Sequence, residues 1–167
     1  MSLEIKIIEK KNLITFLDEG HNVQENFMIC TSQRLLSLFK NPFSDNNDAV
    51  FLLPYYEGRL VGYMGVYHDH IYINNKKEKI GWLSTWWLSE NAAGKGIGKQ
   101  MLKKVYELNE GKIGISSFTE SAKRVYDKSG YFQYLKTLNG IYWRLSFKKS
   151  DFPKNNLKDF ILKNNLK

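Results

Sequence analysis

Three glycines and two lysines alternate in a short segment that lies between an apolar run and a helix-like run. The segment reads AAGKGIGKQ, with Gly94, Gly96 and Gly98 next to Lys95 and Lys99. Because glycine lacks a Cβ atom, several backbone N–H groups of such a loop can approach one ligand. The start of the following helix adds its positive dipole end, and the lysines add full charges. The segment therefore predicts a site for phosphate-type oxygens.

Two common phosphate-binding patterns do not fit this loop. A nucleoside-triphosphate loop, GxxxxGK followed by Ser or Thr, would require a glycine where Ala93 stands and a hydroxyl where Gln100 stands. The dinucleotide pattern GxGxxG, begun at Gly96, would require a third glycine where Met101 stands. The sequence therefore disfavours both of these sites.

Hydrophobic periodicity places the loop between a strand over residues 80–88 and a helix that starts near Gly98. The helix carries a predicted buried stripe of Met101, Leu102, Val105, Tyr106 and Leu108. The other predicted strands cover residues 3–9, 49–56, 59–70, 112–118 and a hairpin over 131–147 that turns at Asn139-Gly140. The other predicted helices cover residues 13–17, 27–39, 120–130 and a tail from about Asn155.

The order β-α-α-β-β-β-α-β-α-β-β predicts an α/β (α+β) fold. Hairpins join the early strands and helices join the later ones, so we expect a mixed, mostly antiparallel twisted sheet of about seven strands with helices on both faces. We expect one domain over residues 1–150 and a C-terminal helical tail over 151–167. Simple alternation over residues 82–87 places Trp82 and Trp86 on one face of their strand and Leu83, Thr85 and Trp87 on the other.

Two motifs resemble those of the GNAT N-acetyltransferase family. The glycine core resembles that family's acyl-coenzyme-A-binding loop, Gln/Arg-x-x-Gly-x-Gly/Ala, with Ala93 where Gln or Arg is usual. The stretch ESAKRVYDKSGYF resembles the second motif, A-x-x-x-Y-x-x-x-G-F/Y, with Thr119 where Asn often begins it. The places of that motif are filled by Ala122, Tyr126, Gly130 and Tyr131. The resemblance covers residues 49–147 and implies a GNAT-like fold.

The resemblance implies that acetyl-CoA is the co-substrate and that an acetyl group passes by direct attack to a primary amine of a small molecule or protein. The implied diphosphate site is the run of backbone N–H groups of Ala93, Gly94, Lys95, Gly96, Ile97, Gly98 and Lys99. The implied pantetheine site is the strand segment of Trp86, Trp87 and Leu88. Tyr126 matches the family's usual proton donor to the departing thiolate.

The general base stays open at this point. The candidates are Glu57, His68, Asp69, His70 and Glu90, and an ordered water relay is a further option. The alternative function is a catalytically weak or inactive GNAT-like module that binds acyl-CoA or a partner protein. It is favoured by Ala93 and Thr119, which depart from the family's motifs, and by the absence of a carboxylate from the strand over residues 80–88.

Composition limits the partners. The 167 residues suit one domain, and Lys and Arg outnumber Asp and Glu 25 to 17, for a net charge of +8. The lysines are scattered and form no recognised basic motif, so we expect an amine acceptor and no nucleic-acid partner.

No apolar stretch is long enough for a membrane span, and the N-terminus lacks the pattern of a secretory signal, so we expect no membrane partner and a cytoplasmic protein. Cys30 is the single cysteine, no metal-ligand spacing is present, and the tail is a candidate homodimer contact.

Overall fold

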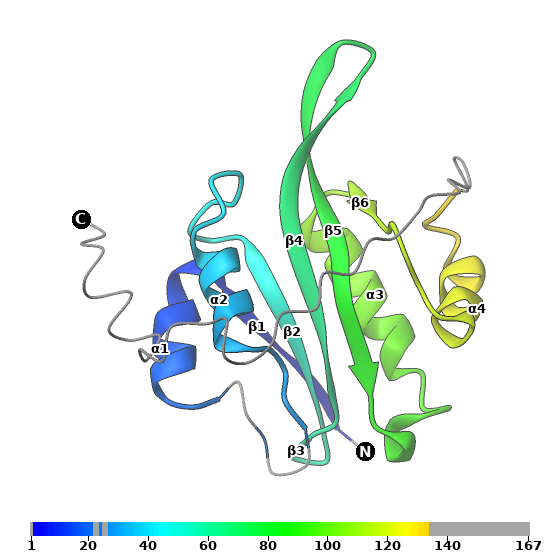
Figure 1. The fold of residues 1–167 in the computed structure, drawn as a ribbon. Helices are drawn as coiled ribbons and strands as arrows, with labels where there is room; N and C mark the ends of the chain where they lie inside the picture. Colours follow the sequence, from blue (N-terminus) through cyan, green and yellow to red (C-terminus); the bar gives the residue numbers. More distant parts are fainter. Residues whose placement is uncertain (1, 22–23, 25–26, 134–167) are drawn as a thin grey trace, which may run out of the picture. The chain divides into compact units, whose positions relative to one another are not determined.

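A six-stranded twisted sheet organises the part of the chain that the computed structural model describes, which is residues 2–21, 24 and 27–133 (Figure 1). The strands are β1 (Leu3–Glu9), β2 (Ala49–Tyr56), β3 (Arg59–Leu60), β4 (Gly62–Ile73), β5 (Lys76–Leu88) and β6 (Ile113–Gly114). Their order is β1-β2-β4-β5-β6, and β3 pairs with β2. All pairs are antiparallel except β5 with β6, which are parallel. The predicted mixed, mostly antiparallel sheet is therefore confirmed for these residues.

Helices cover both faces of this sheet (Figure 1). Within the described residues they are α1 (Leu13–Asp18), α2 (Ser32–Phe39), α3 (Ile97–Leu108) and α4 (Glu120–Ser129), with short 3-10 turns η1 (Lys10–Asn12) and η2 (Glu90–Ala92). Strand β2 is buried on both sides: Phe51 packs in the cluster that contains residues of α1 and α2, and Leu52 packs in the cluster that contains residues of α3 and α4. This double burial explains its nearly continuous apolar sequence AVFLLP.

Helix α2 is shorter than predicted. Its spacing suggested a helix over residues 27–39, but the helix begins at Ser32, after Thr31, whose hydroxyl accepts a hydrogen bond of 3.3 Å from the Arg34 N–H. The preceding residues Ile29 and Cys30 are buried without being helical. The stripe of α3 also ends early, because Leu108 is 41% exposed at the C-terminal end of the helix.

The predicted strand over residues 59–70 is divided into β3 and β4. Pro54 has no N–H to donate, and its carbonyl accepts a hydrogen bond of 3.0 Å from the Val61 N–H. Val61 belongs to neither strand, and the pairing of β2 with β4 is confined to Phe51 and Leu52. The ladder between β2 and β4 therefore ends before Pro54, which pairs with Ile5 of β1 on its other side.

A β-bulge in β5 changes which side chains share a face. Gly65 pairs with Thr85 but Val66 pairs with Leu83, so Ser84 is the extra residue. Leu83 and Trp86 consequently both pack toward α3 and α4. The predicted faces, with Leu83 opposite Trp86, are wrong because simple alternation ignores the bulge.

The predicted hairpin at Asn139-Gly140 and the predicted tail helix from about Asn155 lie outside the described residues. None of the helices that the structure describes is long and apolar enough to cross a membrane.

Candidate functional site

A cleft of about 780 Å³ lies where β5 ends and the glycine loop begins. Three walls enclose it: the end of β5, the loop with the first turn of α3, and one face of α4. Its volume is typical of small-molecule and cofactor sites, which hold about 300–1,000 Å³. The β5 and loop walls are Trp86, Trp87, Leu88, Ser89, Glu90, Ala92, Ala93, Gly94, Gly96, Ile97, Gly98 and Lys99. The α4 wall is Thr119, Ser121, Ala122, Arg124, Val125, Lys128 and Ser129.

Within the part of the chain that the structure describes, one edge of strand β5 is open at this cleft. Its pairing with β6 is limited to Gly81 with Ile113 and Trp82 with Gly114. Beyond Trp82, that edge of β5 has no strand partner among the described residues. Unpaired strand N–H and C=O groups can bond an extended ligand that lies beside them. The three predicted pantetheine residues, Trp86, Trp87 and Leu88, follow on this segment and all line the cleft.

Glycine is required in the loop for two different reasons. Gly94 (φ 75°) and Gly96 (φ 72°) are left-handed, a conformation that residues with a Cβ atom rarely adopt. Gly98 lies in the first turn of α3, where an added Cβ would be 2.8 Å from Cζ2 of Trp86. The first two glycines shape the turn, and the third lets the helix approach β5.

The start of α3 presents backbone donors to the cleft. The Gln100 N–H bonds back to the Gly96 carbonyl at 3.2 Å. The N–H groups of Ile97, Gly98 and Lys99 precede it in the first turn, which has no earlier helical carbonyls to bond. All three residues line the cleft, and free N–H groups at a helix start can bind an anion.

Ala93 and Lys95 are less available to a ligand in the cleft than the other loop residues. The Ala93 N–H is already bonded to the Glu90 carbonyl at 3.0 Å. Lys95 does not line the cleft, and its ammonium group lies 4.3 Å from the centre of the Tyr56 ring, a cation–π contact. Lys99 is thus the loop lysine that lines the cleft.

The α4 wall combines Thr119, which begins the second motif, with two cations that the sequence did not mark as site residues. Thr119 caps the helix by accepting a hydrogen bond of 3.3 Å from the Ala122 N–H, which fixes where α4 begins. Arg124 and Lys128 line the cleft one helical turn apart. Their i, i+4 spacing was a signal in the sequence, but only the fold places that face of α4 opposite the glycine loop.

Tyr126 is buried behind this wall. Its ring packs against Trp86 (5.3 Å between ring centroids), Phe118 (5.9 Å) and Phe132 (5.2 Å). Trp86 lines the cleft, whereas Tyr126 contributes no lining surface. Burial raises the pKa of Tyr126 to about 12, so its phenol keeps its proton at neutral pH.

Of the five candidate bases, Glu90 alone lines the cleft. Glu57 lies in the β2–β3 turn at φ 51°. His70 packs edge-on against Phe43 (5.3 Å between ring centroids), and Asp69 bonds the His70 N–H (2.7 Å). His68 is only 4% exposed, and His70 is half-buried.

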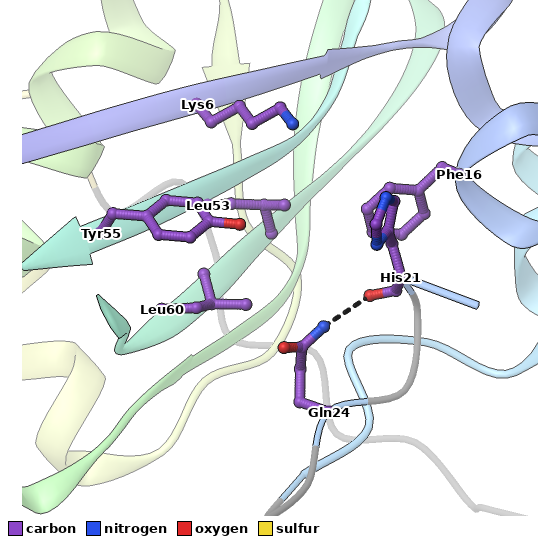
Figure 2. A pocket seen from close by; sticks show the side chains of 7 residues that line it. All are labelled: Lys6, Phe16, His21, Gln24, Leu53, Tyr55 and Leu60. Atoms are coloured by element: carbon purple, nitrogen blue, oxygen red, sulfur yellow. Dashed lines mark hydrogen bonds between the residues drawn. The ribbon is translucent and has the colours of Figure 1, made fainter. Parts of the chain in front are cut away.

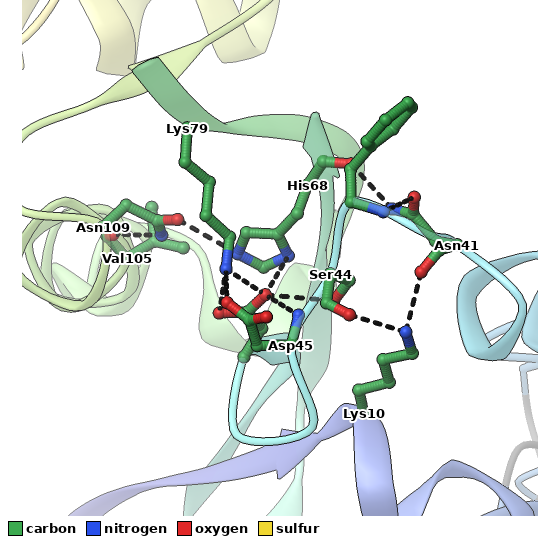
Figure 3. Close-up of polar contacts among 10 residues, drawn as sticks. Lys10, Asn41, Ser44, Asp45, His68, Lys79, Val105 and Asn109 are labelled. Atoms are coloured by element: carbon green, nitrogen blue, oxygen red, sulfur yellow. Dashed lines mark hydrogen bonds and ion pairs between the residues drawn. The ribbon is translucent and has the colours of Figure 1, made fainter. Parts of the chain in front are cut away.

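His68 belongs to a separate polar network that fixes the loop before β2 (Figure 3). Its Nε2 lies 3.1 Å from Oδ1 of Asn109, and its carbonyl accepts a hydrogen bond of 2.7 Å from the Asn41 side chain. Lys10 donates to the carbonyls of Asn41 (2.7 Å) and Ser44 (2.6 Å). None of these residues lines the cleft, so the network has a structural role.

The other face of β5 carries a partly exposed aromatic cluster. Trp87 is 38% exposed, and its ring lies 4.5 Å from that of Phe27 and 6.1 Å from that of Tyr63. Arg34 of α2 donates a hydrogen bond of 3.2 Å to the carbonyl of the bulge residue Ser84. Consecutive residues of β5 therefore serve two faces, with Trp86 toward α3 and Trp87 toward Phe27.

A second pocket of about 100 Å³ lies beside β1, β2 and β3 (Figure 2). It is lined by Lys6, Phe16, His21, Gln24, Leu53, Tyr55 and Leu60. This volume is well below that of typical cofactor sites. Among the described residues, no group of three His, Cys, Asp or Glu side chains is arranged to hold a metal ion.

Comparison with known proteins identifies the family. The sequence matches the model of the acetyltransferase (GNAT) family over residues 17–131, and the chain belongs to that family. No individual protein of curated function matches the sequence significantly.

Solved structures share the fold. A glucosamine-6-phosphate N-acetyltransferase from Arabidopsis thaliana superposes with a TM-score of 0.56 at 16% identity, covering 86% of this chain and 100% of its own. An aminoglycoside acetyltransferase from an uncultured soil metagenomic sample, in complex with trehalose, gives 0.55 at 18% identity, with 86% and 97% covered. AAC(6')-Iy in complex with the bisubstrate analogue CoA-S-monomethyl-acetylneamine gives 0.54 at 13% identity, with 88% and 100% covered. At these identities the likeness concerns the fold alone.

Proposed function

We propose that the protein is an N-acetyltransferase that moves an acetyl group from acetyl-CoA to a primary amine. The observation that carries this proposal is the cleft in which the first turn of α3 and the open edge of β5 meet. Backbone donors and Lys99 at one wall suit a diphosphate. The unpaired strand groups at the other wall suit the amide-bearing pantetheine arm.

The chemistry needs few protein groups. The amine nitrogen forms a bond to the thioester carbonyl carbon, the carbon–sulfur bond breaks, and the sulfur leaves as a thiolate that takes up a proton. Tyr126 is the donor we propose for that proton, because its phenol is un-ionised at neutral pH and its ring contacts Trp86 at the cleft wall. The amine must give up a proton in turn. We propose Glu90 as the base, because it is the one candidate that lines the cleft.

The proposed acceptor is a small-molecule or protein amine. Proteins of the same fold are named for aminoglycosides and for glucosamine-6-phosphate, both amine-bearing sugars. The aromatic face of Trp87, Phe27 and Tyr63 supports an acceptor that approaches β5 from the side opposite Trp86, since sugar rings and apolar groups pack on aromatic surfaces.

A thiol-release assay tests the proposal. Purified protein is incubated with acetyl-CoA and a panel of aminoglycosides, amino sugars and lysine peptides, and free thiol and acetylated product are both measured. We expect turnover with at least one amine and none when the amine is omitted. Calorimetry with acetyl-CoA is run in parallel. Binding without turnover on any acceptor would support the alternative, a catalytically inactive acyl-CoA-binding module, and absence of binding would refute both.

A further inference from the structure

Two cationic residues of α4 line the cleft and have no ion-pair partner in the described part of the chain. Arg124 and Lys128 are both exposed and both line the cleft. Neither forms an ion pair with any of the described residues, whereas Lys123, beside them on the same helix, pairs with Asp127 at 2.7 Å and does not line the cleft. The helix thus carries one lysine that is paired and two cations that, among the described residues, are unpaired and line the cleft.

The loop wall of the cleft, opposite α4, already offers groups that could bind one anion. The first-turn N–H groups of α3 and the Lys99 side chain lie on the loop side of the cleft. Coenzyme A carries two separate anionic groups, the diphosphate and the 3′-phosphate on its ribose. If the loop binds the diphosphate, the 3′-phosphate must be bound by residues of another wall of the same cleft. The guanidinium fork of Arg124 matches a phosphate bidentately, and Lys128 adds a point charge one turn away.

We propose that Arg124 and Lys128 bind the 3′-phosphate of coenzyme A, so that the protein selects acetyl-CoA over its 3′-dephospho form. This inference rests on the proposed function, since it assumes that the cleft binds acetyl-CoA. It adds a recognition element on α4 that the glycine-loop motif does not contain.

The test compares two ligands on three proteins. Calorimetry measures Kd for acetyl-CoA and for acetyl-3′-dephospho-CoA with the wild type, with the double variant Arg124→Gln and Lys128→Gln, and with the control Lys123→Gln. We expect the wild type to prefer acetyl-CoA by about ten-fold, as charge-assisted hydrogen bonds to an exposed phosphate allow. The double variant should lose that preference through weaker binding of acetyl-CoA alone, and the control should keep it.

The outcomes separate this inference from the proposed function. If the wild type binds both ligands equally, the inference is wrong and the proposed function stands. If the double variant weakens both ligands by the same factor, the two cations act at the diphosphate and the inference is again wrong. If the wild type binds neither ligand, the proposed function fails, and the inference fails with it. Because all three side chains are exposed or half-buried, equal thermal unfolding midpoints should confirm that folding is intact.

Discussion

Gly98 and Trp86 meet so closely that a Cβ atom on the glycine would lie 2.8 Å from Cζ2 of the tryptophan. The same Cβ would lie 3.4 Å from Cδ1 of Leu88. The contact sets how near the first turn of α3 comes to the end of β5. It therefore fixes the spacing between the proposed diphosphate site and the proposed pantetheine site.

Gly98→Ala should weaken acetyl-CoA binding. The added methyl group must displace either the Trp86 ring, which is held by Tyr126, or the start of α3. Overpacking of this kind costs about 1–3 kcal/mol, so we expect a lower free energy of unfolding in urea and a Kd raised about ten-fold in calorimetry. The control Lys103→Ala changes the exposed side of the same helix and should leave Kd unchanged. Wild-type affinity in Gly98→Ala would contradict the role given to this contact.

A pair of substitutions at Gly96 separates backbone strain from charge. Gly96 has φ 72° and open space around its Cα, so Asn and Asp add similar volume and both tolerate the left-handed conformation better than other residues. Only Asp adds a negative charge where phosphates are proposed to bind. We expect Gly96→Asp to bind acetyl-CoA at least about ten-fold more weakly than Gly96→Asn in calorimetry. Equal affinities of the two variants would argue against a phosphate at this loop.

The parts of the fold that were predictable depend on local chemistry. The turns at Glu57-Gly58 and at Asn74-Asn75 place residues at positive φ, and α4 ends at Gly130 with φ 75°. The start of α2 was not predictable from periodicity, because Ile29 and Cys30 are apolar through burial in the core rather than through helix formation. The bulge at Ser84 was missed for a similar reason, since it depends on pairing with β4 and leaves no mark in the strand's own sequence.

The candidate site also has a part that could be predicted from the sequence and a part that could not. The glycines of the loop led to the prediction of a phosphate-type site, and in the structure each meets a backbone requirement that glycine alone meets easily. The place of a long side chain is not fixed by the loop sequence in this way: Lys95 contacts the Tyr56 ring, whereas Lys99 lines the cleft. The position of Arg124 in the cleft wall depends on how α4 packs against α3, and no local sequence pattern specifies that packing.

Tyr126→Phe should slow turnover and leave cofactor affinity nearly unchanged. The phenylalanine ring keeps the contacts with Trp86, Phe118 and Phe132, so the variant should fold like the wild type. It lacks the hydroxyl proposed to protonate the thiolate, and loss of a general acid costs about a hundred-fold in rate. The measurement is kcat with an amine that the wild type acetylates, together with Kd for acetyl-CoA. An unchanged kcat would remove Tyr126 from the mechanism.

Acid should destabilise the fold through His68. Burial lowers the pKa of His68, and this outweighs the opposite effect of Asp48, whose Oδ2 lies 3.9 Å from Nδ1. Between the unfolded-state pKa of 6.5 and the lower folded-state pKa, the unfolded chain binds more protons, so stability falls as pH falls. Burial raises the pKa of Asp48, but hydrogen bonds from Lys79 and from the Asp45 N–H together lower it below its ordinary value, so the contribution of Asp48 is lost only in stronger acid.

Urea unfolding at pH 7.5 and pH 5 measures the effect of His68 on stability separately from that of Asp48. We expect the wild-type midpoint to fall on acidification, and His68→Gln to show a much smaller change, because glutamine does not titrate and its amide can still donate to Oδ1 of Asn109. The control His21→Gln alters an exposed pair with Glu19 and should keep most of the wild-type pH dependence. If His68→Gln retains the full change, the acid sensitivity originates elsewhere in the chain.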